Sequence, residues 1–166
     1  MRFTLQAILI TVLVACSSPK DDSSRSPHLL RGIHNLSDEN RRIIDEADEF
    51  QTVKRVSDLP KPVEALCADH HETMADVGGA WRDGCIVDNP PLPSTRLIWA
   101  SRRDDLFLIH YESGGYAHSY HLMLVRGSEG EAKELWQASS MGAVRKDNIR
   151  QAIRSDALSD FDAFLR

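Results

Sequence analysis

The sequence predicts an α+β fold, in which an antiparallel four-stranded meander over about residues 95–138 is flanked by N-terminal and C-terminal helices. Two observations predict it. Apolar residues recur with a period of two through this central stretch, and with helical spacing before and after it. The turn signals between the strand-like runs are close together, which leaves room only for hairpins. Helices placed before and after a run of strands are typical of α+β domains.

Two helices are expected before the sheet. Ser37 can cap the first one, and Asp38 and Glu39 lie favourably against its amino-terminal dipole. Its apolar positions repeat at helical spacing: Ile43, Ile44, Ala47 and Phe50. A second, shorter helix is expected over about 63–73, introduced by prolines at 60 and 62, which first-turn positions tolerate.

The central strands alternate apolar and polar residues. The four strand-like runs are Arg96–Ser101, Leu106–Glu112, Ala117–Arg126 and Glu131–Ala138. Gly114 and Gly115 predict a two-residue turn between the second and third of them. Helical spacing then returns from about 149 to 165, with Asp147 as the expected cap.

Composition and charge place the chain among ordinary globular proteins. It has 166 residues, 42% of them hydrophobic and 27% charged, and a formal net charge of −5. A chain of this length indicates one domain. An acidic chain without clustered Lys and Arg lacks the means to neutralise phosphates, so we expect no nucleic-acid partner.

The N-terminus carries a secretory pattern. A single basic residue, Arg2, precedes the apolar stretch from Phe3 to Ala15. This stretch is shorter than the roughly 20 residues that a spanning helix needs. It ends in Leu13-Val14-Ala15-Cys16, which resembles the lipobox of bacterial lipoproteins. The alternative from the residues alone is an uncleaved signal anchor or a buried N-terminal helix.

The resemblance, which covers residues 1–17, has consequences for location. It implies that the signal peptide is removed after Ala15 and that Cys16 becomes a lipidated N-terminus anchored in a membrane. Ser17 rather than Asp after the cysteine implies the outer membrane, with the protein facing the periplasm. The expected organisation is a signal peptide over 1–15, a lipidated flexible tether over 16–36 that is rich in Ser, Asp and Pro, and a single globular domain over 37–166.

The remaining cysteines are a pair. The chain has three Cys, so lipid on Cys16 leaves Cys67 and Cys85 in an oxidising compartment, where disulfides persist. We predict that these two are bonded, which would stabilise the domain by about 3 kcal/mol. The alternative is a pair of free thiols in a metal or redox site, although the spacing is not that of a CxxC motif.

Histidines and a carboxylate are concentrated around the Gly114-Gly115 turn. With a two-residue turn, His110, Glu112, Ser119 and His121 share one face of the sheet, while His118 lies among aromatic and apolar residues on the other. We therefore predict a metal site or an acid-base site formed by His110, Glu112 and His121. The alternative is the solvated side of a hairpin, with His118 as a hydrogen-bonded core histidine.

A second prediction concerns a ligand groove beside these histidines. In the same register Trp99 lies opposite Leu108 and Trp136 lies opposite His121, and an aromatic rim around His110 and His121 would suit a small groove for a ligand or a peptide. Ser119, His118 and Trp136 are the predicted ligand-binding residues. The alternative for Trp136 is ordinary packing.

Two functional hypotheses follow. The first is a lipid-anchored envelope protein without enzymatic activity, whose domain binds another macromolecule such as an envelope protein. The second is a metal-binding protein or hydrolase that faces the periplasm and uses His110, Glu112 and His121. The phosphate-binding loop, the dinucleotide fingerprint and the nucleophile elbow are missing from the sequence, and no cofactor is expected.

Overall fold

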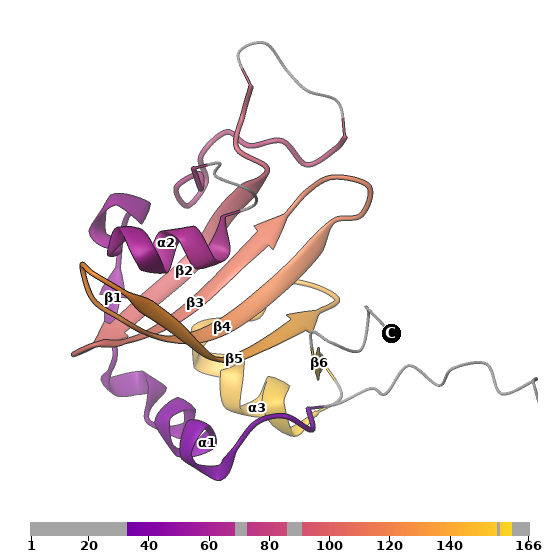
Figure 1. Cartoon of the computed structure of the whole chain (residues 1–166). Coiled ribbons are helices and arrows are strands. Elements are labelled where there is room, and N and C mark those ends of the chain that lie inside the picture. The colour runs from indigo at the N-terminus through magenta and orange to yellow at the C-terminus, as the bar shows by residue number, and fades with distance from the viewer. Residues whose placement is uncertain (1–32, 69–72, 86–90, 156, 161–166) are drawn as a thin grey trace, which may run out of the picture.

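A six-stranded antiparallel sheet with helices on both faces forms the domain (Figure 1). The computed structural model describes residues 33–68, 73–85, 91–155 and 157–160; the predicted signal peptide, Cys16 and most of the predicted tether lie outside them. The strands follow one another in chain order: β1 (Gln51–Val53), β2 (Thr95–Arg103), β3 (Leu106–Ser113), β4 (Ser119–Gly127), β5 (Ala132–Ser140) and β6 (Leu158–Asp160).

The α+β fold is confirmed, and the predicted meander is its centre. The prediction of four strands was incomplete, because β1 and β6 extend the sheet at its two edges. Both are three residues long, which is too short for a clear alternating pattern. The segment around β6 was expected to continue a helix, but Leu158 is fully buried and Asp160 pairs with Ala138 of β5.

The helices are shorter than the sequence predicts. They are α1 (Asp38–Asp45), η1 (Ala47–Glu49), η2 (Val56–Asp58), α2 (Lys61–Cys67), η3 (Lys146–Asn148) and α3 (Ile149–Arg154). Ser37 caps α1 as expected, since its hydroxyl accepts a hydrogen bond from the Asn40 amide at 3.2 Å. In the described residues no helix is long and apolar enough to cross a membrane.

Each face of the sheet has its own core. We call the side under α1 and α3 the first face and the side under α2 the second face (Figure 1). The first core includes Ile44, Phe50, Leu108, Leu122, Leu124, Trp136, Ile149 and Leu158. The second includes Val63, Cys67, Leu97, Phe107, Ile109, Tyr111, Met123 and Val125. Since β3 and β4 contribute to both cores, their side chains are buried on both sides.

The beginning of the described chain is fastened to β6. The Asp160 carboxylate accepts hydrogen bonds from the amides of His34, at 2.8 Å, and Asn35, at 3.2 Å. Leu36 is buried in the first core. Residues 34–36, which the sequence assigns to the tether, are therefore in contact with the folded domain.

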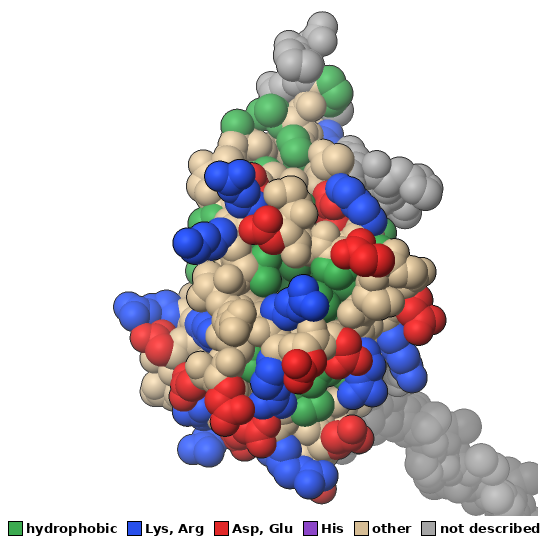
Figure 2. Space-filling view, turned by 90° about the vertical axis from the view of Figure 1, so that its left-hand side faces the viewer, with side chains coloured by type: hydrophobic (Ala, Val, Ile, Leu, Met, Phe, Trp, Pro, Cys, Tyr) green, Lys and Arg blue, Asp and Glu red, His purple; other side chains and the backbone are tan. Residues whose placement is uncertain are grey.

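The surface beside β1 carries charges of both signs. Figure 2 shows basic and acidic side chains intermixed over the side of the molecule on which β1 lies. Several of them are paired, as are Arg103 with Glu46 at 2.6 Å and Arg150 with Asp48 at 2.7 Å. The described residues of this face consequently form no continuous basic patch of the kind that binds nucleic acid.

Candidate functional site

The β3–β4 hairpin has a longer loop than the sequence predicts. Ser113 pairs with Ser119, so the loop spans residues 114–118 instead of two glycines alone. The Gly114 amide donates to the Ser94 carbonyl at 2.9 Å, and the Gly115 amide donates to the Asp83 carbonyl at 3.2 Å. Backbone bonds to the preceding segments therefore hold the loop in this form.

The longer loop shifts the pairing by three residues and reverses the faces that β4 presents. His110 lies opposite Leu122 on the first face, whereas His121 lies opposite Tyr111 on the second. The prediction that His110, Glu112 and His121 share a face was therefore wrong. Among the described residues no group of three or more His, Cys, Asp or Glu side chains could hold a metal ion.

His110 is the most buried of the predicted site residues, with 0% of its surface exposed. Its Nδ1 lies 2.7 Å from the His121 carbonyl oxygen, and its Nε2 lies 2.9 Å from the Val144 amide nitrogen. The carbonyl needs a donor and the amide needs an acceptor, so the ring is the neutral tautomer with hydrogen on Nδ1. Burial lowers the pKa of His110, which favours the same neutral form.

The peptide of Val144 also fixes Trp99. The indole N–H of Trp99 donates to the Val144 carbonyl at 2.7 Å, and its ring centroid lies 5.6 Å from that of His110. Val144 is in the connection between β5 and η3, so His110 and Trp99 together fasten this connection to β2 and β3. The contact with the His110 ring and the hydrogen bond to Val144 together determine the orientation of the indole.

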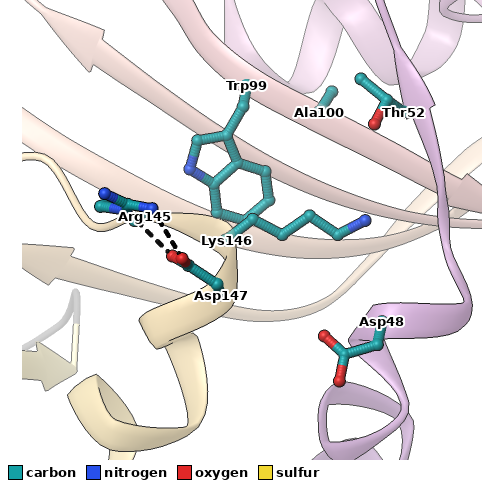
Figure 3. A pocket seen from close by; sticks show the side chains of 7 residues that line it. All are labelled: Asp48, Thr52, Trp99, Ala100, Arg145, Lys146 and Asp147. Atoms are coloured by element: carbon teal, nitrogen blue, oxygen red, sulfur yellow. Dashed lines mark hydrogen bonds and ion pairs between the residues drawn. The ribbon is translucent and has the colours of Figure 1, made fainter.

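Trp99 forms part of an open cleft of about 470 Å³ on the first face (Figure 3). Its lining comes from η1, β1, β2 and η3 with the residue before it: Asp48, Thr52, Trp99, Ala100, Arg145, Lys146 and Asp147. In Figure 3 the indole turns its broad side to the viewer and the Lys146 side chain runs across one end of it. We call this site the Trp99 cleft.

The charged groups of the Trp99 cleft are already engaged with partners. Arg145 pairs with Asp147, with an Nη2 to Oδ2 distance of 2.7 Å, and the Lys146 ammonium donates to the Phe50 carbonyl at 2.7 Å. Asp48 pairs with Arg150 from α3. The pairing with Arg145 lowers the pKa of Asp147, so both members of this pair are ionised at neutral pH.

A second polar cluster lies near the hairpin end of the first face. The Glu112 carboxylate, 5% exposed, accepts from Arg96 at 2.6 Å and contacts His118 Nε2 at 2.7 Å. The His118 ring, with a side chain 40% exposed, stacks on Tyr120 at 4.7 Å and lies 5.3 Å from Trp81. Glu112 thus meets His118 rather than the two predicted imidazoles.

The third cluster lies on the second face, at the base of the hairpin loop. His121 Nε2 is 2.9 Å from the hydroxyls of both Ser113 and Ser119, which are 3.0 Å from each other. The ring stacks on Tyr111 with centroids 4.9 Å apart. Burial, with a smaller contribution from the neighbouring His110, lowers the pKa of His121 to about 4, so this imidazole is neutral at physiological pH.

The remaining predicted residues have structural surroundings or lie outside the described part. Trp136 is 3% exposed in the first core and pairs with Leu124, so its predicted place on a ligand rim beside His121 was wrong. Cys67 is buried and Cys85 is exposed, and both are free in the structure, without the predicted disulfide. Cys16 falls outside the described residues.

No sequence pattern predicts the Trp99 cleft as a whole, because its lining residues come from segments up to about 100 positions apart along the chain. Of its lining residues the sequence pointed only to Trp99, as part of an aromatic rim around His110, and the two rings do lie side by side. Comparisons of the chain with protein-family models, curated proteins and solved structures find no match.

Proposed function

We propose that this chain is a lipid-anchored protein of the bacterial cell envelope and that its folded domain binds a macromolecule there. The Leu13-Val14-Ala15-Cys16 lipobox supports the anchor, and Ser17 supports the outer membrane, on the side that faces the periplasm. The binding role is carried by the Trp99 cleft, whose aromatic surface is held rigid before any ligand arrives.

The hydrogen bonds behind the cleft support a binding role, because they hold the Trp99 side chain in one position. Trp99 and the connection that carries Arg145 and Lys146 are both fastened through the Val144 peptide to the neutral His110. A preorganised aromatic side chain loses little conformational freedom when it binds, and tryptophan and arginine dominate the energetics of many binding surfaces.

The metal-binding or hydrolytic alternative loses its support in the same geometry. It depended on His110, Glu112 and His121 acting together, and the two imidazoles lie on opposite faces of the sheet. Both nitrogens of His110 are used by backbone groups, so this ring has no lone pair to offer a metal ion.

The anchor is tested in the bacterium with the full chain. We expect metabolic labelling with a palmitate analogue to tag the wild-type protein, and membrane fractionation to recover it with the outer membrane. Cys16→Ser should abolish both. Cys85→Ser is the matched control, because it makes the same cysteine-to-serine change at an exposed position of the folded domain and leaves the lipobox intact. An unlabelled wild-type protein, or equal labelling of Cys16→Ser, would contradict the anchor.

The binding role is tested by site-specific photo-crosslinking in intact cells. A photoreactive amino acid at position 146, within the Trp99 cleft, should give discrete high-mass adducts of the anchored protein. The same group at exposed Glu129, in the turn between β4 and β5, is the control. Identical adduct patterns from the two positions, or none from position 146, would contradict a binding role for the cleft.

A further inference from the structure

We infer that the Trp99 cleft binds the pyranose units of an uncharged glycan. This inference names the ligand class for the binding role proposed above and rests on it. Three properties of the cleft carry it: its open shape, its fixed aromatic surface and the balance of charges around it.

The shape fits one or two sugar units of a longer chain. The cleft has a volume of about 470 Å³ and is open to solvent. Small-molecule pockets of about 300–1,000 Å³ are usual, but those that enclose drug-like ligands bury most of the ligand. An open cleft instead accepts a polymer segment whose neighbouring units continue into solvent on either side.

The aromatic surface fits the apolar side of a sugar ring. A pyranose presents several C–H groups on one side, and these pack favourably against the electron-rich face of an indole. In Trp99 the N–H edge is occupied by the Val144 carbonyl and the ring abuts His110, so its remaining surface is what the cleft offers. A ring held in this way needs no rearrangement to stack.

The charges argue for an uncharged ligand. Two cationic side chains, Arg145 and Lys146, face two anionic ones, Asp48 and Asp147, so the formal charges of the lining cancel. For an anionic ligand, attraction to Arg145 and Lys146 is offset by repulsion from the two carboxylates, and for a cationic ligand the signs are exchanged, so a charged ligand gains no net attraction to offset its desolvation. A wholly apolar ligand would desolvate these polar groups without replacing their hydrogen bonds.

Hydroxyl groups suit the same lining because each can both donate and accept. The carboxylates of Asp48 and Asp147 keep lone pairs beyond those used in their ion pairs, and the Arg145 guanidinium has five N–H donors. The Thr52 hydroxyl adds a group of either kind on exposed β1. Sugar hydroxyls can therefore bind to this lining without breaking the existing pairs.

The test is calorimetry on the full chain in detergent, with chitotetraose and maltotetraose as neutral probes and tetragalacturonate as an anionic one. We expect saturable binding of at least one neutral tetrasaccharide in the millimolar range or tighter, and no binding of the anionic probe. A pull-down on purified cell-wall sacculi then distinguishes wall glycan from other sources of the same chemistry. Failure of both neutral probes and of the sacculi, or preference for the anionic probe, would overturn the inference.

Two variants locate the binding. Trp99→Ala should weaken binding at least about tenfold, as expected for the loss of one stacked aromatic group worth about 1.4 kcal/mol. Trp81→Phe is the matched control, because it alters the tryptophan of the Glu112 cluster and should leave affinity within about twofold.

Since Trp99→Ala also disturbs the Val144 contact, Thr52→Val serves as a conservative second variant, with an expected weakening of about threefold for one lost hydrogen bond. Unchanged affinity in both Trp99→Ala and Thr52→Val would overturn the assignment of the site. If the anchor and the crosslinks at position 146 are found but no glycan binds, the ligand class fails and the binding role stands.

Discussion

The β3–β4 hairpin places one buried histidine on each face of the sheet, and the two are held in different ways. His110, on the first face, is bonded to backbone groups at both nitrogens, and one of these groups belongs to the connection between β5 and η3. His121, on the second face, has its Nε2 between two serine hydroxyls of its own hairpin. The first histidine therefore links distant segments, and the second closes a local loop.

This difference shows why similar residues in one stretch of sequence need not form one site. A bond between distant segments fixes geometry that the local chain cannot fix, here the position of the Trp99 cleft. A bond within a hairpin mainly stabilises a turn that backbone pairing already favours. Removing His110 should consequently cost more than removing His121.

The largest expected effect is that of His110→Ala. It leaves the Val144 amide and the His121 carbonyl without their partners and creates a cavity at a fully buried position, so we expect a loss of about 4 kcal/mol in the free energy of unfolding. His121→Ala should cost about half as much, because Ser113 and Ser119 can still bond to each other. Urea denaturation measures both, and equal losses would contradict the distinction between the two faces.

The next effect is a loss of stability in mild acid. The pKa of His121 is lowered to about 4 in the folded protein, against about 6.5 in an unfolded chain. Between these values the unfolded state binds a proton that the folded state excludes, so stability present above pH 6.5 falls by about 3 kcal/mol as the pH approaches 4. The lowered pKa of His110 acts in the same direction.

Urea denaturation across this pH range checks the prediction. The glutamine in His121→Gln does not titrate, so the free energy of unfolding should fall less steeply with decreasing pH than in the wild-type protein. The pH dependence that remains comes from His110 and the carboxylates. A slope unchanged by His121→Gln would show that this imidazole titrates normally in the folded protein.

The hairpin also shows where prediction from sequence ends. The alternation of apolar and polar residues correctly located the four central strands. It does not show which face of the sheet a given side chain of β4 occupies, because both faces are buried. The choice depended on the loop over 114–118, in which the amides of Gly114 and Gly115 are bonded to Ser94 and Asp83, residues from segments earlier in the chain. No local pattern contains that information.

One misjudged loop accounts for most of the errors at the candidate site. With Ser113 opposite Ser119, the positions of His121 and of Leu122 and Leu124 exchange faces. The pairing of β4 with β5 then puts Trp136 in the core instead of beside His121. The cap of α1 was easier to predict, because the bond from the Asn40 amide to Ser37 joins residues only three positions apart. The other predicted cap was wrong, since Asp147 lies within η3 and Asn148 is the N-cap of α3.

A smaller effect is expected from the serines of the second face. Ser113→Ala or Ser119→Ala removes one hydroxyl from His121 Nε2 while the other remains, so each should cost about 1 kcal/mol. The double variant should cost more than the sum of the two, because it leaves Nε2 of a buried imidazole without either hydroxyl. A double-mutant cycle in urea measures this coupling, and simple additivity would show that the two bonds are independent.

The last prediction concerns the two thiols, and it is measured as their rates of alkylation. Burial raises the pKa of Cys67 to about 12, with further contributions from the charges of Glu134 and Glu64. Since the thiolate is the reactive form, the folded protein should alkylate rapidly at exposed Cys85 and very slowly at Cys67. Mass spectrometry after a short iodoacetamide pulse measures the two rates, with Cys85→Ser as the control that leaves one slow site. Protein from the periplasm in which neither thiol reacts until a reductant is added would instead establish the disulfide predicted from the cysteine count, and would require Cys85 and Cys67, at the end of α2, to come within bonding distance.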